Sequence, residues 1–303
     1  MTTDILLAAS LKNFKKFVIQ TPSGTTSYSF GPLFDAKGFT VDWGDGIVNS
    51  QTSHTYASAN YYSITVKYTK LNIINNSTSD SSNVLIDTYV SIPEENSIVD
   101  AANMYYGDTN LLAVGSMWLK KALTLRGLFE GCYSLSSVGE VLTQVCQDFS
   151  YMYGDCNVLQ TVQLCDTSNG TDFSGMHIDN LVLNEVPAYN TSNGIFFTRM
   201  FQGCSGIQEI PALDVSKGTD FTYMFDGCNG LTSILAYGFR YDLDISRCPL
   251  GHDALVILLN NLGIAAASPT NFYYSSLFAT LTSEEKAIAT GKGWTILDAN
   301  PPL

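Results

Sequence analysis

Large apolar residues recur every 24 residues through the middle of the chain. The first set of equivalent positions, called here the methionine column, contains Met104, Leu128, Met152, Met176, Met200 and Met224. Leucine, isoleucine or valine follows each of them seven and ten residues later. Such a period is typical of a solenoid, whose small units bury their apolar faces only by stacking on one another. The pattern therefore predicts six stacked coils, numbered one to six below, over residues 99–238.

Each coil is expected to contain one short helix and one short strand. In coil six, Asp220 is placed to cap a helical turn that carries Phe221 and Met224 on one side. Gly227 would end that turn in a conformation that other residues resist. The residues after it suit an extended segment, and Pro211 bars continued helix at this point of coil five. The strands should lie parallel and form a ribbon.

The part of each repeat around the methionine column is called the turn segment below. It carries a motif of the form M-F-x-G-C, as in Met200–Cys204 and Met224–Cys228. This motif resembles the leucine-rich repeat of BspA-like surface proteins over about residues 100–238. The resemblance implies a role in recognition or adhesion. Coil four departs from the motif, because His177, Asp179 and Asn180 replace the expected Phe, Gly and Cys. That coil is either distorted or carries a particular function.

Three segments before the repeats resemble the polycystic kidney disease (PKD) domain, an immunoglobulin-like β-sandwich. They are Phe39–Gly46, Ser53–Tyr56 and Tyr61–Val66, in the order and spacing of that family. Asn60 stands where the family often has Gly, but Asn also tolerates a positive φ, so the turn can be kept. Proteins that join such a sandwich to BspA-like repeats are commonly envelope or extracellular proteins, so the combined resemblance implies recognition or adhesion more than chemistry.

Two helices are expected after the repeats, one over residues 253–261 and one that begins at Thr282–Glu285 and ends at Gly291. An apolar segment, Trp294–Leu297, follows. Because an open solenoid end would expose the apolar columns to water, this region is expected to cover it.

The fold class is therefore expected to be mainly β with short helices. The chain divides into an N-terminal arm (1–15), an immunoglobulin-like β-sandwich (16–98), a solenoid of six 24-residue repeats (99–238) and a small α/β C-terminal cap (239–303).

The net charge and the apolar segments of the chain exclude two classes of partner, nucleic acid and membranes. The net charge of −13 disfavours nucleic acid, which requires clustered Lys and Arg. The longest apolar run of helical pattern, residues 254–259, is far shorter than the ~20 residues of a membrane span, so no membrane insertion is expected. Residues 5–9 are apolar, but lysines follow them instead of preceding them, so no secretory signal is expected.

Few residues offer catalytic chemistry. His54, His177 and His252 lie far apart and outside any known catalytic motif. The cysteines of the repeats are expected to pack as free thiols, since equivalent side chains in stacked coils point in parallel. Asp42 and Asp45 are expected to cap turns instead of binding Ca²⁺. No catalytic residue, metal or cofactor is therefore predicted, and a polysaccharide- or peptide-acting enzyme is a remote alternative.

The preferred functional hypothesis is a virion surface component of a bacteriophage, such as a fibre, decoration or receptor-binding protein. Release by lysis would make a signal peptide unnecessary. The alternative is a BspA-like cell-surface or extracellular adhesin. The expected partners are other virion or surface proteins within an oligomeric assembly, or a host surface protein or glycan. The repeats contain 13 acidic and 6 basic residues between positions 101 and 240, which favours a basic or carbohydrate partner.

Four residues are candidate contacts for that partner. His177 and Asp179 break the repeat in coil four, and a surface position is expected for the histidine. Tyr189 and Tyr237 follow the methionine column at the same distance, outside the apolar columns. These two tyrosines can equally belong to the core.

Overall fold

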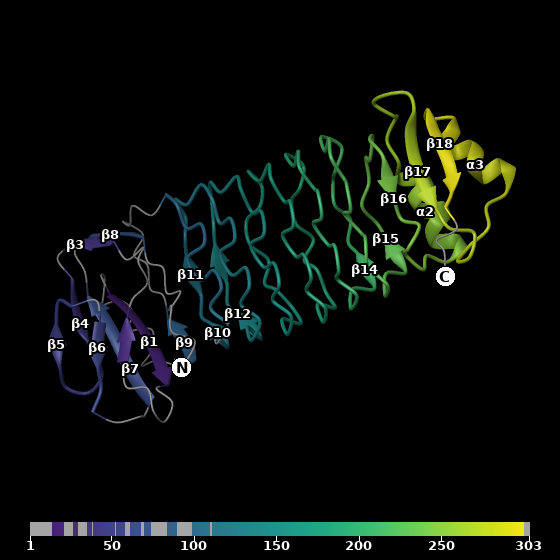
Figure 1. Cartoon of the computed structure of the whole chain (residues 1–303). Helices are drawn as coiled ribbons and strands as arrows, with labels where there is room; N and C mark the ends of the chain where they lie inside the picture. Colours follow the sequence, from purple (N-terminus) through teal and green to yellow (C-terminus); the bar gives the residue numbers. More distant parts are fainter. Residues whose placement is uncertain are drawn as a thin grey trace, which may run out of the picture.

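The computed structural model describes residues 14–20, 27–29, 35–37, 39–51, 53–57, 61–67, 70–73, 84–89, 99–109 and 111–299. Figure 1 shows antiparallel strands at one end, a long stack of coils in the middle and a unit with two helices at the other end. The chain is thus a mainly β solenoid with short helices, as the 24-residue period predicted.

The turn segment of each coil is a run of tight turns, where a short helix was predicted. Its N–H groups alternate between two directions. Met152 N donates to Phe149 O of the same coil at 3.2 Å, whereas Tyr151 N and Tyr153 N donate to Ser174 O and Met176 O of the next coil, each at 2.9 Å. A helix would direct all of these donors along its own axis. Here half of them join neighbouring coils.

Left-handed residues explain why the turn segment is not a helix. In every coil the residue before the methionine column and the residue three after it have φ between 57° and 78°. A helix needs φ near −60° throughout. Gly227 has φ 77°, as expected for its position, but Tyr223 and Asp179 adopt the same region at 58° and 57° without being glycine. The left-handed conformation costs such residues about 1–2 kcal/mol each, which the hydrogen bonds between coils can offset.

Short parallel strands connect some of the coils. In each pair the partners are 24 residues apart, which confirms the predicted register. The pairs are β10 (Ala113–Val114) with β12 (Ser137–Val138), β11 (Met117–Trp118) with β13 (Val141–Leu142), and β14 (Glu209–Ile210) with β15 (Ser233–Ile234).

The methionine column forms one continuous buried file. All six of its members are at most 2% exposed. A parallel stack of aromatic rings runs beside it, one ring per coil in the turn segment, with neighbouring ring centres 5.4–6.1 Å apart. Its members are Tyr105, Phe129, Tyr153, His177, Phe201 and Phe225. The spine on which the solenoid prediction depends is therefore present.

Aspartates and asparagines close the corners of the coils. Asp220 Oδ1 accepts a hydrogen bond from Thr222 N at 2.9 Å, so it caps a turn as predicted, although the turn does not continue into a helix. A second corner uses the same chemistry with a following serine, as in Asp214 and Ser216 N at 3.0 Å. The segment after this corner ends in Gly170, Gly194 or Gly218, each pressed against a buried phenylalanine ring. This second motif was not recognised in the sequence.

The N-terminal unit consists of antiparallel pairings. Its largest sheet has the order β5-β4-β7-β1-β9, and two further pairs are β2 with β6 and β3 with β8. Their bounds are β1 Phe14–Gln20, β2 Ser27–Ser29, β3 Asp35–Lys37, β4 Thr40–Asp42, β5 Val48–Asn49, β6 Ser53–Thr55, β7 Tyr61–Lys67, β8 Lys70–Ile73 and β9 Val84–Tyr89.

Trp43 is the buried centre of the PKD-like motif, and the Tyr56 hydroxyl donates to Trp43 O at 3.1 Å. Asp42 and Asp45 accept hydrogen bonds from Gly44 N and Ile47 N, which confirms their predicted role in turns. The predicted arm, residues 1–15, lies outside the described residues except for the first two residues of β1.

The C-terminal unit is a small α/β cap. Three parallel strands, in the order β16-β17-β18, alternate with two helices. Their bounds are β16 Leu243–Asp244, α2 His252–Asn261, β17 Thr270–Tyr274, α3 Ser283–Thr290 and β18 Trp294–Asp298. Thr282 and Glu285 form the predicted reciprocal cap at the start of α3. Lys292 Nζ donates to Leu259 O, Asn260 O and Leu262 O around the end of α2, at 2.7–3.1 Å.

Candidate binding surface

Three carboxylates from successive coils form a row along the turn segments. Glu130, Asp155 and Asp179 occupy neighbouring positions of coils two, three and four; Asp179 is exposed and the other two are partly exposed. Stacked coils are about 4.8 Å apart, which brings like charges close together. These residues are called the acidic row below.

Repulsion within the acidic row acts on its pKa values. Partial burial, and then the neighbouring Asp155 charge, raises the pKa of Glu130 above its ordinary value. Burial and then the Asp179 charge likewise raise the pKa of Asp155. The Arg126 guanidinium acts on Glu130 in the opposite direction. Binding of a cationic group would relieve this repulsion, so the row favours basic ligands.

Two arginine–tyrosine pairs lie on the turn segments, one on coils two and three beside the acidic row and one on coils five and six. The Arg126 guanidinium stands over the Tyr151 ring at 5.5 Å, and the Arg199 guanidinium stands over the Tyr223 ring at 5.4 Å. Each pair joins adjacent coils and holds an aromatic ring at the surface, where Tyr223 is 53% exposed. Such rigid aromatic rings are common contacts in protein interfaces.

His177 lies in the core, so the expectation of a surface histidine in contact with a partner was wrong. The residue is fully buried, and its ring stacks between Tyr153 at 5.4 Å and Phe201 at 5.7 Å. It occupies the position where other coils carry Phe or Tyr, which explains why its ring points into the core. Burial lowers the pKa of His177 to about 3, so the imidazole is neutral at physiological pH.

Coil four is not distorted by its unusual residues. His177 N and Asp179 N keep their regular hydrogen bonds to coil five, at 2.9 and 2.7 Å. Asn180 replaces the repeat cysteine, and its Oδ1 accepts from Cys156 N at 2.8 Å. Of the two residues predicted here as contacts, Asp179 therefore remains available to a partner, and His177 does not.

The two candidate tyrosines are not equivalent, because the register slips by one residue in coil six. Asp214 pairs with Tyr237 across 23 residues, so Ala236, not Tyr237, takes the buried position that corresponds to Tyr189. Tyr189 is 3% exposed, and its expected role as a partner contact was wrong. Tyr237 is 44% exposed and remains a candidate. The slip could not be seen from the methionine column, which ends before it.

The repeat cysteines join adjacent coils as thiols. All seven cysteines are free and buried. Cys204 Sγ donates to His177 O at 2.8 Å and Cys228 Sγ to Phe201 O at 3.0 Å. Burial raises the pKa of Cys228 to about 12, which keeps the thiol protonated. The prediction of free core cysteines is confirmed, and Cys248, which had no predicted role, donates in the same manner to Phe225 O at 3.6 Å.

The other histidines have structural contacts. His54 Nε2 lies 2.7 Å from Asp45 Oδ2, and its ring stacks on Trp43, so this histidine helps to hold the PKD-like motif together. His252 Nε2 lies 3.0 Å from Glu285 Oε1 and links α2 to α3. In the part of the chain that the structure describes, no group of three or more His, Cys, Asp or Glu is arranged to hold a metal ion. Within the same residues no helix is long and apolar enough to cross a membrane.

Comparison with known proteins gives a family match within the repeats. Residues 123–236 match the model of a family described as a Mycoplasma protein of unknown function, DUF285. The match falls within the region that resembles BspA-like repeats and supports that resemblance. No curated protein matches the chain. A crystal structure of the T. pallidum leucine-rich repeat protein (TpLRR) aligns with 50% of this chain and 73% of that chain, at 16% identity and a TM-score of 0.36. The family match does not extend to the PKD-like segments, so that resemblance stays a prediction.

Proposed function

We propose that the chain is a non-enzymatic scaffold that binds a basic partner through the acidic row of Glu130, Asp155 and Asp179. The stacking of these three carboxylates on successive coils carries this proposal, because it holds like charges close together at the surface. The neighbouring charge adds to the effect of burial in raising the pKa values of Glu130 and Asp155. A stack of coils holds these carboxylates at fixed spacing. Little conformational entropy would be lost when a basic partner binds there.

The neighbouring aromatic pairs suit the same role. Tyr151 lies on the turn segment of coil three, which also carries Asp155, and Tyr223 lies on coil six, beyond the row. Each ring lies beneath an arginine of the preceding coil. Lysine or arginine side chains of a partner could contact both the carboxylates and the rings. The binding surface would then extend over several coils, with many contacts of modest strength.

A charge-matched comparison tests the acidic row. The E130Q/D155N/D179N variant should bind an immobilised lysine octapeptide about tenfold more weakly than the unmodified protein, by biolayer interferometry at 50 mM salt. The E140Q/E185Q/E209Q variant loses the same charge at exposed positions elsewhere on the solenoid. Equal weakening in both variants would mean that only net charge matters and would refute the proposed row.

We propose further that the protein is displayed on a surface, either on a bacteriophage virion, as preferred from the sequence, or on a cell envelope. The BspA-like resemblance of the repeats supports a surface role, and the DUF285 match, to a family of unknown function, does not choose between the two. Mass spectrometry of purified particles and of envelope fractions decides between them. Recovery in envelopes and not in virions would exclude the virion hypothesis.

A further inference from the structure

The hydrogen-bond ladder between the turn segments ends at coil six with open donors. At each of the five junctions between coils, four N–H groups donate to the next coil at 2.7–3.1 Å. The corresponding donors of coil six are Phe221 N, Tyr223 N, Phe225 N and Gly227 N. None of them has an acceptor among the described residues. The coil thus presents an unpaired backbone edge toward the cap.

The cap does not continue the ladder, although it is attached nearby. Arg247 Nη1 binds Asp226 Oδ1 at 3.3 Å and Cys248 Sγ approaches Phe225 O, so the chain returns to coil six through side chains. On the opposite side of the coil, backbone bonds such as Gly238 N to Asn261 O at 2.8 Å keep the cap in place. Space remains between the turn segment and β16.

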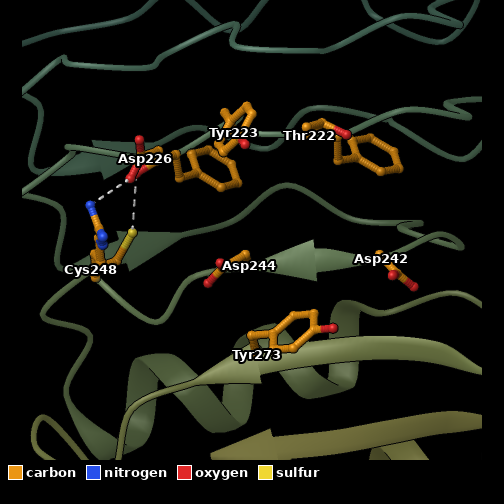
Figure 2. Close-up of a pocket in the computed structure, with 10 residues that line it drawn as sticks. Thr222, Tyr223, Asp226, Asp242, Asp244, Cys248 and Tyr273 are labelled. Carbon is orange, nitrogen blue, oxygen red and sulfur yellow. Dashed lines mark hydrogen bonds and ion pairs between the residues drawn. The ribbon is translucent and has the colours of Figure 1, made fainter. Parts of the chain in front are cut away.

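A cavity of about 330 Å³ fills that space. Phe221, Tyr223 and Phe225 of coil six form one wall, and Asp242 and Asp244 of the β16 region form the other. Figure 2 shows Asp226 at coil six and Asp244 on the facing strand β16, with Tyr273 on the next strand, β17. The open donors and the carboxylates therefore border the same cavity.

The charges of the cavity restrict the ligand. Asp226, Asp242 and Asp244 line it together with a single cation, Arg247, which is bound to Asp226. A simple anion would pair with the open N–H groups but meet net negative charge, and a simple cation would leave the donors unpaired. An extended peptide with a lysine or arginine satisfies both, because its alternate carbonyls accept from the edge and its side chain reaches the carboxylates.

We propose that this cavity, called the ladder-end site, binds an extended peptide segment of a partner protein that carries Lys or Arg. The peptide backbone takes the place that the next coil occupies at every other junction. In those junctions the accepting carbonyls come from every second residue of a segment of tight turns. An extended peptide also directs alternate carbonyls to one side, so it can offer the same order of acceptors. The site is distinct from the acidic row and goes beyond the function proposed above.

A designed peptide tests the ladder-end site in the full chain. The probe is a capped hexapeptide of alternating lysine and threonine, and binding is followed by amide chemical shifts in two-dimensional NMR. The amides of Phe221, Tyr223 and Phe225 should shift on titration, more than the equivalent amides of coil five. The same peptide with glutamate in place of lysine should not bind. Inorganic phosphate that shifts the same amides would identify an anion site and overturn the proposal.

Matched variants separate the site from general charge effects. Asp244 Oδ1 accepts from Ser246 N as Asp214 Oδ1 accepts from Ser216 N, and an asparagine can accept equally well. An asparagine at position 242 can still accept from Asn271 N and gives up only the bond from Asn271 Nδ2. The D242N/D244N variant should therefore fold and bind the lysine peptide about tenfold more weakly. The D166N/D214N variant, with the same charge loss at the far corners of the coils, should bind it like the unmodified chain. Equal affinity in both variants, or no amide shift with the unmodified chain, would refute the ladder-end site.

Discussion

The Nε2 atom of His177 lies 3.1 Å from the hydroxyl oxygen of Tyr189, and both side chains are buried in coil four. The Tyr189 ring is also stacked near the imidazole, 5.9 Å away. Two residues that were expected to meet a partner at the surface therefore meet each other in the core. Nδ1 of the same imidazole has no partner within the described structure. Protonation of this ring would place a charge in an apolar stack.

Acid should therefore destabilise the protein through His177. The folded-state pKa of about 3 lies below the ordinary 6.5, so only the unfolded state gains a proton between these values. The contribution of the neutral His177 side chain to the free energy of unfolding is present above pH 6.5 and is lost as the pH decreases. The expected loss is about 2 kcal/mol between pH 7 and pH 5. Urea unfolding at the two pH values measures this loss.

The H177F/Y189F variant should lack that part of the acid sensitivity. Phe restores the residue usual at this position of the repeat, and the second change removes the hydroxyl that would otherwise lose its partner. Y189F alone is the control and should retain the pH dependence. An identical loss of stability at pH 5 in the double variant would contradict the assignment.

Gly194 should not tolerate alanine. A Cβ at this position would collide with the Phe197 ring of the buried spine, so G194A is expected to lose about 1–3 kcal/mol of unfolding free energy. Gly251 is the matched control, because a Cβ there meets nothing within 4 Å. Thermal unfolding followed by circular dichroism compares the two. A G194A protein as stable as G251A would mean that the ring can move aside.

Lys292 should stabilise the cap. Its ammonium group donates to three carbonyls at the end of α2, and K292M would leave these acceptors without that partner. The expected loss is about 1–2 kcal/mol, measured by urea unfolding. K286M removes a lysine that stands over the Tyr274 ring and should cost much less. Similar losses in both variants would show that the three carbonyl contacts add little.

The seven cysteines should resist alkylation until the chain unfolds. Burial raises the pKa of Cys146 and Cys165 to about 12 and that of other thiols in the same direction, which suppresses the reactive thiolate. Iodoacetamide at pH 8 should modify none of the seven in the folded protein and all of them in urea, as counted by intact mass. Rapid labelling of the folded protein would mean that the coils open readily.

Apolar spacing predicted the stack well, because burial alone determines it. Met152 and Met176 lie in one file because each coil can hide its apolar side chains only against the next. The capping residue Thr282 was equally predictable, since its partner Glu285 is local in sequence. Both predictions needed only short-range chemistry or a strict period.

The remaining features depend on contacts that no local pattern reveals. Tyr151 adopts a left-handed conformation because its N–H group donates to Ser174 O of the neighbouring coil, not because its own sequence favours it. The direction of the His177 ring follows from the rings of coils three and five. The open edge at Phe221 depends on where the cap returns, far along the chain. Each of these three features could be recognised only once the neighbouring coil or the cap was placed in the structure.

The uniform junctions have a consequence for how such a chain can vary in length. Every boundary between coils uses the same four backbone bonds, and the backbone of one residue resembles that of the residue 24 positions away. Duplication or loss of one whole coil before coil six would create no new kind of junction in the turn segments. An insertion of any other size within the turns would misalign donors and acceptors at its boundary. Natural variants of this protein should therefore differ in steps of a single coil, with the two end units unchanged.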